Sequence, residues 1–156
     1  MSDTMNITMT INGEAITRDV PVRLNLVDFI RTEAGLTGSH VGCEHGVCGA
    51  CTIEVDGQAV RGCLMLAVQA DGASVTTIEG FGDRAAGLRE AFSNRNALQC
   101  GYCTPGMLAS ALEYIEAGGT ADRAAIREHI SGNYCRCTGY QAIVEAIADV
   151  IEGGRA

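Results

Sequence analysis

Residues 42–52 read Gly42-Cys43-Glu44-His45-Gly46-Val47-Cys48-Gly49-Ala50-Cys51-Thr52, and their three cysteines are separated by four and then two residues. A distant fourth cysteine, Cys63, completes the spacing of a plant-type [2Fe–2S] ferredoxin loop. The glycines of the loop let the backbone turn its N–H groups toward a sulfur cluster. A zinc knuckle would favour two short cysteine pairs instead. The spacing therefore predicts one [2Fe–2S] cluster held by Cys43, Cys48, Cys51 and Cys63.

The remaining cysteines form a second set, which consists of Cys100, Cys103, Cys135 and Cys137. Cys103 precedes Thr104-Pro105, a strong helix start, and we expect a second helix to begin just after Cys137. Positive helix ends would lower the pKa of these thiols and stabilise an anionic cluster. Spacing alone leaves a second [2Fe–2S] cluster and a structural zinc ion both open. The neighbouring first site favours iron and sulfur, because two centres in series suggest an electron relay.

Composition excludes several classes of function. The 156 residues carry a formal net charge of −8 before any cluster is counted, so phosphate backbones would repel the chain and nucleic-acid binding is not expected. No segment approaches about 18 uninterrupted apolar residues, and the first residues resemble no signal peptide. We therefore expect a cytoplasmic protein without membrane insertion, whose eight cysteines are not paired in disulfides.

The first half, residues 1–80, predicts an α+β domain of about five short strands and one helix. Alternating residues over 6–11 and 14–20 flank Asn12-Gly13, which is a strong hairpin signal. A second hairpin, 52–55 and 58–61 around Asp56-Gly57, would carry Cys63 back beside the 43–51 loop. A last strand is expected over 74–78, and Asn25 would cap a helix over 25–35.

The second half, residues 87–156, predicts a helical domain. Four helical stretches are expected near 88–98, 104–117, 121–131 and 138–152, with Thr120 as the N-cap of the third. The last has one apolar face, formed by Ile143, Val144, Ile147, Val150 and Ile151. Residues 81–86 mix glycine with charge and predict a linker between the two domains. His40, His45 and His129 are expected to be solvated, because four cysteines already complete each site.

Three motifs together resemble the small iron–sulfur subunit of the molybdenum hydroxylases, the family of xanthine oxidase and bacterial carbon monoxide dehydrogenase. They are the 42–52 stretch, Gln99-Cys100-Gly101-Tyr102-Cys103-Thr104-Pro105-Gly106 and Cys135-Arg136-Cys137-Thr138-Gly139-Tyr140. The resemblance covers nearly the whole chain and implies a β-grasp ferredoxin domain followed by a four-helix bundle, each with one [2Fe–2S] cluster. Tyr134 departs from the pattern, since many relatives have an aliphatic residue there.

The resemblance also implies a direction for electron transfer. Electrons would leave molybdopterin, in its cytosine dinucleotide form, in a large subunit and enter the cluster of the second cysteine set. They would pass to the cluster of the first set and then to FAD in a medium subunit. Gln99 matches the family glutamine that hydrogen-bonds the pterin, and Cys137 matches the ligand near the pterin amino group. A dimer of heterotrimers is implied, with no catalytic residue in this chain.

Two other functions remain open from the residues themselves. The chain could be a free-standing two-cluster ferredoxin that donates electrons to several partners. It could also be a protein-interaction module that a structural zinc ion stabilises and that has no redox activity. The substrate of an assembled enzyme is open as well, because the family holds its substrate pocket in the large subunit.

Overall fold

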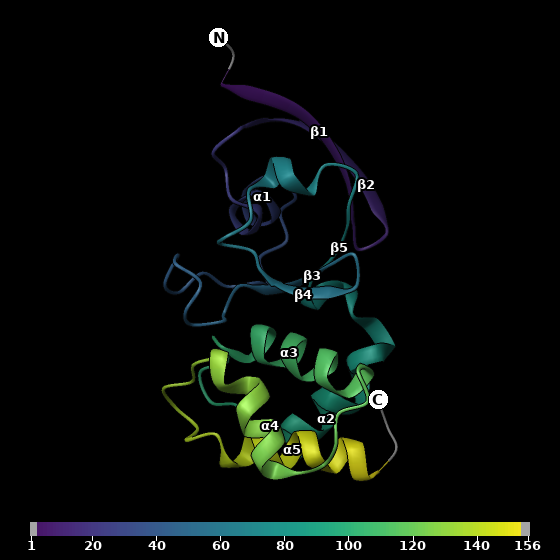
Figure 1. Cartoon of the computed structure of the whole chain (residues 1–156), viewed down its shortest axis with the longest axis vertical. Helices are drawn as coiled ribbons and strands as arrows, with labels where there is room; N and C mark the ends of the chain where they lie inside the picture. Colours follow the sequence, from purple (N-terminus) through teal and green to yellow (C-terminus); the bar gives the residue numbers. More distant parts are fainter. Residues whose placement is uncertain (1–2, 154–156) are drawn as a thin grey trace.

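The structure is a computed structural model that describes residues 3–153. A strand-rich half lies above a helical half, and α3 faces β3 and β4 where the halves meet (Figure 1). The first half contains β1 (Thr4–Ile11), β2 (Glu14–Pro21), α1 (Leu26–Thr32), β3 (Thr52–Val55), β4 (Gln58–Arg61) and β5 (Ser74–Thr76). The second half contains α2 (Ala86–Asn94), α3 (Thr104–Glu116), α4 (Arg123–His129) and α5 (Gln141–Glu152). None of the helices described is long and apolar enough to span a membrane.

The five strands form one sheet in the order β2-β1-β5-β3-β4, in which β1 and β5 are parallel and the other pairs antiparallel. Both predicted hairpins are confirmed. Asn12 and Gly13 have φ of 51° and 87°, and Asp56 and Gly57 have φ of 49° and 81°. Positive φ at both central residues is the requirement of a type I′ turn, which matches the twist of the flanking strands.

Helix α1 packs its apolar face on the sheet and completes the first hydrophobic core. Leu26, Phe29 and Ile30 are fully buried with Ile7 and Ile53 from the strands. The Asn25 side chain accepts a hydrogen bond of 2.8 Å from the backbone N–H of Asp28, which confirms the predicted N-cap. This core holds the β3–β4 hairpin in place, and Cys51 and Cys63 lie just outside its two ends.

The helices α2 to α5 enclose a second core, and three of them do not begin where the sequence predicted. Helix α2 spans Ala86–Asn94 rather than 88–98. Asp122, not Thr120, caps α4, because its carboxylate accepts from the backbone N–H groups of Ala124 and Ala125. Helix α5 begins at Gln141 rather than near residue 138, after a turn in which Tyr140 has a φ of 69°. The expected apolar face of α5 is confirmed; Ile143, Val144, Ile147 and Val150 are buried and Ile151 is half-buried.

The segment expected to be a linker, residues 81–86, is packed into the helical half. Gly82–Ala85 forms a short 3₁₀ turn that leads directly into α2. Phe81 is 2% exposed and Ala85 is fully buried, and both belong to the helical core. Gly82 and the charged residues after it, which indicated a linker, are exposed on this turn. Phe81 and Ala85 hold the turn against the helical core.

The loop that leads toward Cys43 is held by Glu79. One carboxylate oxygen of Glu79 accepts from the backbone N–H of Gly38 at 2.6 Å, and the other accepts from the Thr77 hydroxyl at 2.5 Å. Partial burial raises the pKa of Glu79, but these hydrogen bonds and nearby His40 outweigh it and hold the pKa below its ordinary value. The ionised carboxylate therefore stabilises the folded chain.

Glu79→Gln should destabilise the chain at pH 7, and the loss should become smaller as the pH is lowered to 3. A carboxyl whose pKa is depressed on folding contributes stability above its unfolded pKa of about 4.3 and loses it as the pH falls through the folded value. The side chain is largely exposed, so solvent screening limits the expected loss to about 0.5–1 kcal/mol. Urea unfolding at both pH values measures it. Glu128→Gln, on the exposed face of α4, is the control, and an equal loss for both variants at pH 7 would contradict the role of Glu79.

Candidate functional site

The first cysteine set comes together beside the β3–β4 hairpin. Cys43 and Cys48 lie in the loop before β3, Cys51 immediately precedes β3 and Cys63 follows β4. The backbone N–H of Gly62 donates to the carbonyl of Cys51 at 3.1 Å, which brings the two ends of the hairpin together. The thiol of Cys51 interacts with those of Cys63 and Cys48, and the backbone N–H of Cys48 donates to Cys43 Sγ at 3.3 Å. The four side chains predicted to share one cluster are therefore neighbours.

The thiols of the first set differ in pKa. Backbone hydrogen bonds from Cys48 and His45 lower the pKa of Cys43 to about 6, whereas burial raises the pKa of Cys51 to about 11. Cys51 is the one buried member of the set. Amide groups aimed at sulfur would also stabilise the sulfur atoms of a bound anionic cluster.

The second cysteine set comes from the start of α3 and the turn before α5. Cys100 Sγ and Cys137 Sγ lie 3.6 Å apart, and the thiol of Cys103 interacts with that of Cys135. Thr138 donates to Cys135 Sγ from its backbone N–H at 3.4 Å and from its hydroxyl at 3.1 Å. The loop between Cys100 and Cys103 thus faces the turn that holds Cys135 and Cys137.

The thiols of the second set do not share the uniformly lowered pKa that helix N-termini would favour. Burial raises the pKa of Cys103 to about 12 although it is the N-cap residue of α3. Burial also acts to raise the pKa of Cys135, but the hydrogen bonds from Thr138 outweigh it and the pKa is lowered. Because α5 begins at Gln141, Cys137 is not at a helix N-terminus. The pKa of Cys135 is therefore lowered by hydrogen bonds from Thr138 in the turn.

The donor chemistry fits two iron–sulfur clusters. All eight cysteines are free thiols, and each set supplies the four thiolates that a [2Fe–2S] cluster takes. Within residues 3–153, no group of three or more His, Cys, Asp or Glu side chains lies close enough to hold a single metal ion. The thiols of the second set approach one another in pairs, an arrangement suited to two iron atoms. A cavity of about 170 Å³ between the sets is lined by Cys48, Cys100, Cys103, Cys135 and Cys137, among others.

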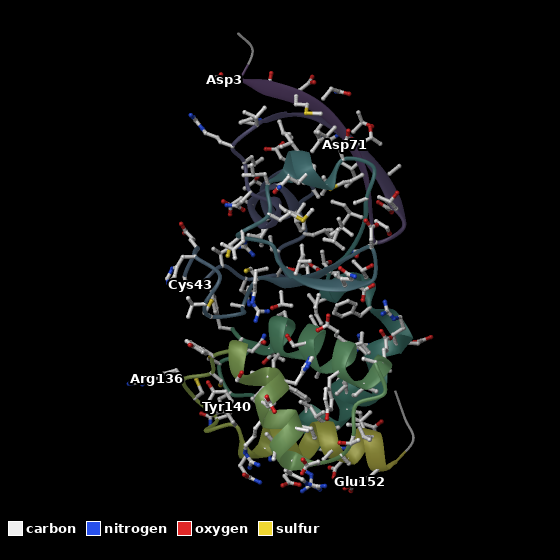
Figure 2. All side chains as sticks on the ribbon, viewed as in Figure 1. Asp3, Cys43, Asp71, Arg136, Tyr140 and Glu152 are labelled. Atoms are coloured by element: carbon white, nitrogen blue, oxygen red, sulfur yellow. The ribbon has the colours of Figure 1, made fainter. Side chains whose placement is uncertain are left out.

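A backbone hydrogen bond connects the two cysteine sets. The N–H of Tyr134 donates to the carbonyl of Cys48 at 2.8 Å, so a residue next to Cys135 contacts a cysteine of the first set directly. The side chain of Tyr134 is 54% exposed, and its departure from the family pattern leaves this contact intact. Figure 2 shows Cys43 and Arg136 on the same side of the molecule, one in each half.

Several residues at this junction were not found from the sequence. Gly106, in the first turn of α3, lies so near Gly49 that a Cβ atom there would be 2.1 Å from the Gly49 carbonyl oxygen. Asn133 is buried at the same point. The available signal was the pair Gly132-Asn133 just before the Cys135 motif, but a polar residue in a loop ordinarily indicates solvent exposure.

The three histidines differ in their surroundings, and His40 is not simply solvated. Its ring stacks on Tyr102 at 4.5 Å between centroids, and its Nδ1 lies 2.8 Å from the Tyr102 carbonyl oxygen. The Tyr102 hydroxyl donates to the carbonyl of Val41 at 2.7 Å. This reciprocal contact ties the loop before Cys43 to the loop between Cys100 and Cys103. His45 is exposed in its loop, and His129 Nε2 lies 3.0 Å from the Ser110 carbonyl oxygen.

The two residues predicted to contact a pterin are neighbours at an exposed edge. Gln99 Nε2 donates to the carbonyl of Cys137 at 3.1 Å. Gln99, Cys100 and Cys137 are all exposed, in contrast to buried Cys51. The second set is thus accessible from outside at this edge, although contact with a pterin remains a prediction.

Comparison with known proteins identifies the family. A 2Fe-2S iron–sulfur cluster binding domain matches residues 9–79, and a [2Fe-2S] binding domain matches residues 77–148. The caffeine dehydrogenase subunit gamma of Pseudomonas sp. strain CBB1 is 54% identical over 92% of this chain and 89% of its own length. The chain belongs to the small iron–sulfur subunits of the molybdenum hydroxylases. This confirms the family that the three cysteine motifs indicated.

Two further relatives support the assignment. The nicotine 6-hydroxylase small subunit of Paenarthrobacter nicotinovorans is 52% identical over 95% of this chain and 90% of its own length. The crystal structure of quinoline 2-oxidoreductase from Pseudomonas putida 86 contains a chain that is 45% identical, with a TM-score of 0.90. That match covers 99% of this chain and 100% of the other. Both the sequence and the overall fold of this chain are therefore similar to those of known members of the family.

Proposed function

We propose that this chain is the electron-transfer subunit of a heteromeric molybdenum hydroxylase. It would relay electrons from a molybdopterin centre in a large subunit, through two [2Fe–2S] clusters, to FAD in a medium subunit. The observation that carries the proposal is the pair of four-thiol sets, one partly buried and one open at an edge, connected by the Tyr134–Cys48 hydrogen bond. Family membership supports the same function and favours it over a zinc-stapled module.

We propose the finer fold and domain division on the same basis. The five-stranded mixed sheet crossed by α1 suits a β-grasp ferredoxin domain over 1–80, and α2 to α5 suit a four-helix bundle over 87–156. The first two and the last three residues of these ranges lie outside the described residues. Residues 81–86, expected to be a linker, would belong to the helical domain in this proposal, which the buried positions of Phe81 and Ala85 support.

In this proposal Cys43, Cys48, Cys51 and Cys63 hold one cluster, and Cys100, Cys103, Cys135 and Cys137 hold the other. A [2Fe–2S] cluster supplies one-electron redox chemistry when bound. The chain orients the thiolates, donates N–H groups from Cys48 and Thr138 toward sulfur, and excludes water from Cys51. Each of these actions adjusts the stability of the anionic form and so the reduction potential of the site.

We place the entry of electrons at the exposed edge of the second set. Gln99 and Cys137 are the pterin contacts there, and the molybdopterin carries the cytosine dinucleotide form. The first set faces the FAD subunit, and the complex is a dimer of heterotrimers. The eight free thiols are compatible with the reducing cytoplasm in which we place the complex.

Co-expression with the two partner subunits tests this function. The chain should co-purify in a stable complex with molybdopterin and flavin subunits, and substrate added without air should bleach the visible absorption of the iron–sulfur clusters. The relatives are named for caffeine, nicotine and quinoline, so N-heterocycles are the first compounds to try. A chain that stays monomeric beside both partners, yet exchanges electrons with soluble proteins, would instead be a free-standing ferredoxin.

A further inference from the structure

Asn133 is a buried polar residue with partners in both halves of the molecule. It is 2% exposed, and its Nδ2 donates to the carbonyls of Gly106 at 3.0 Å and Gly49 at 3.3 Å. Its Oδ1 accepts from the Ser110 hydroxyl at 2.9 Å and from Arg61 Nη2 at 3.4 Å. The side-chain amide is therefore satisfied at both ends, with partners from the first cysteine loop, β4 and α3.

The chain around Asn133 is tied to the same place by its backbone. Arg61 Nη2 donates to the carbonyl of Gly132 at 2.9 Å, and Arg61 also contacts the Thr52 hydroxyl next to Cys51. The following residue, Tyr134, donates its N–H to the Cys48 carbonyl, and Cys135 comes next. Asn133 thus lies two residues from one proposed ligand and contacts a carbonyl of Gly49, the neighbour of another.

We infer that Asn133 is a positioning residue that sets the spacing between the two cysteine sets. An amide side chain offers two N–H donors and one carbonyl acceptor with two lone pairs, which is the combination that this site uses. An aspartate would turn a second acceptor toward two carbonyl oxygens, and a leucine would leave those oxygens without their donor. The inference rests on the proposed function, because spacing matters for electron transfer only if both sets hold clusters.

Asn133→Asp and Asn133→Leu test it in the full chain that carries both clusters. Each variant should keep iron, sulfide and the separate EPR signal of each reduced cluster, because none of the cysteines is altered. The magnetic coupling between the two reduced clusters should change, since dipolar coupling falls with the cube of the distance. Hydrogen exchange at the Tyr134 amide should become about tenfold faster, as expected when buried hydrogen bonds are lost.

Two matched variants separate positioning from general packing. Ser110→Ala removes a partner of Oδ1 within the helical half, while the Nδ2 donation across the junction to Gly49 remains, so coupling and exchange should stay close to those of the unaltered chain. Tyr134→Ala removes an exposed side chain but keeps its backbone N–H, and should also leave both unchanged.

If an Asn133 variant fails to bind its clusters, Arg61→Met tests the same inference. It removes the donations to Gly132 and to Oδ1 and should shift the coupling in the same direction by a smaller amount. Unchanged coupling and unchanged Tyr134 exchange in loaded Asn133 or Arg61 variants would overturn the inference while the proposed function stands. An unaltered chain that binds no iron would instead contradict the proposed function.

Discussion

Gly106→Ala should destabilise the chain by about 3 kcal/mol, the upper end of the cost of overpacking a rigid site. The added Cβ would lie 2.1 Å from the Gly49 carbonyl oxygen and 3.1 Å from that of Ala50. Neither is a flexible side chain that can rotate away, because both are backbone atoms of the first cysteine loop. Relief requires α3 to move off the loop, which would disturb the Asn133 side chain that bridges Gly106 of α3 and Gly49 of the loop.

Urea unfolding and iron content measure the effect of Gly106→Ala. We expect a lower free energy of unfolding and impaired loading of the first set, whose Cys48 and Cys51 flank the displaced backbone. Ala117→Ser, which adds one atom at the exposed end of the same helix, should change stability by no more than about 0.5 kcal/mol. Equal stability of the two variants would show that α3 does not dock on the loop as closely as the structure indicates.

Cys137→Ser and Cys43→Ser should separate the two clusters. Cys137 lies at the exposed edge beside Gln99, so its loss should impair the second cluster and lower turnover of the assembled complex by more than about 100-fold. Cys43 receives backbone donors in the first loop, and its loss should chiefly disturb the first cluster. Oxidation of substrate at molybdenum could then still reduce the remaining cluster, although electrons would not reach FAD efficiently.

EPR of the reduced complexes, recorded beside steady-state turnover with the flavin acceptor, distinguishes the two variants. Each should lose a different signal, and the signal that remains should keep its g-values. Intact signals and normal turnover in Cys137→Ser would show that electrons do not enter through the second set.

Much of the fold follows from short-range signals in the sequence. Asn12-Gly13 and Asp56-Gly57 specify type I′ turns because both central residues adopt positive φ, and Asn25 caps α1 through its own side chain. The cysteine spacings gave both candidate sets and, with their neighbours, the family. These features depend on residues close together in the chain, so no knowledge of packing was needed.

The structure departs from the sequence-based expectations at positions where long-range packing decides the conformation. Thr120 and Asp122 are both residue types that cap helices well, and the structure uses Asp122. Phe81 lies in a glycine-rich, charged stretch, yet the helical core buries it. The roles of Gly106 and Asn133 depend on contacts across long sequence separations, with Gly49 as a common partner. A single sequence does not show which loop will meet which helix.

Metal analysis and EPR of the full chain, purified without air, test the central claim most directly. Two [2Fe–2S] sites require about four iron atoms and about four labile sulfides per chain, with two distinguishable signals after reduction. We predict that result from the two four-thiol sets. A colourless protein, or stoichiometric zinc at the second set with a single EPR signal, would contradict it.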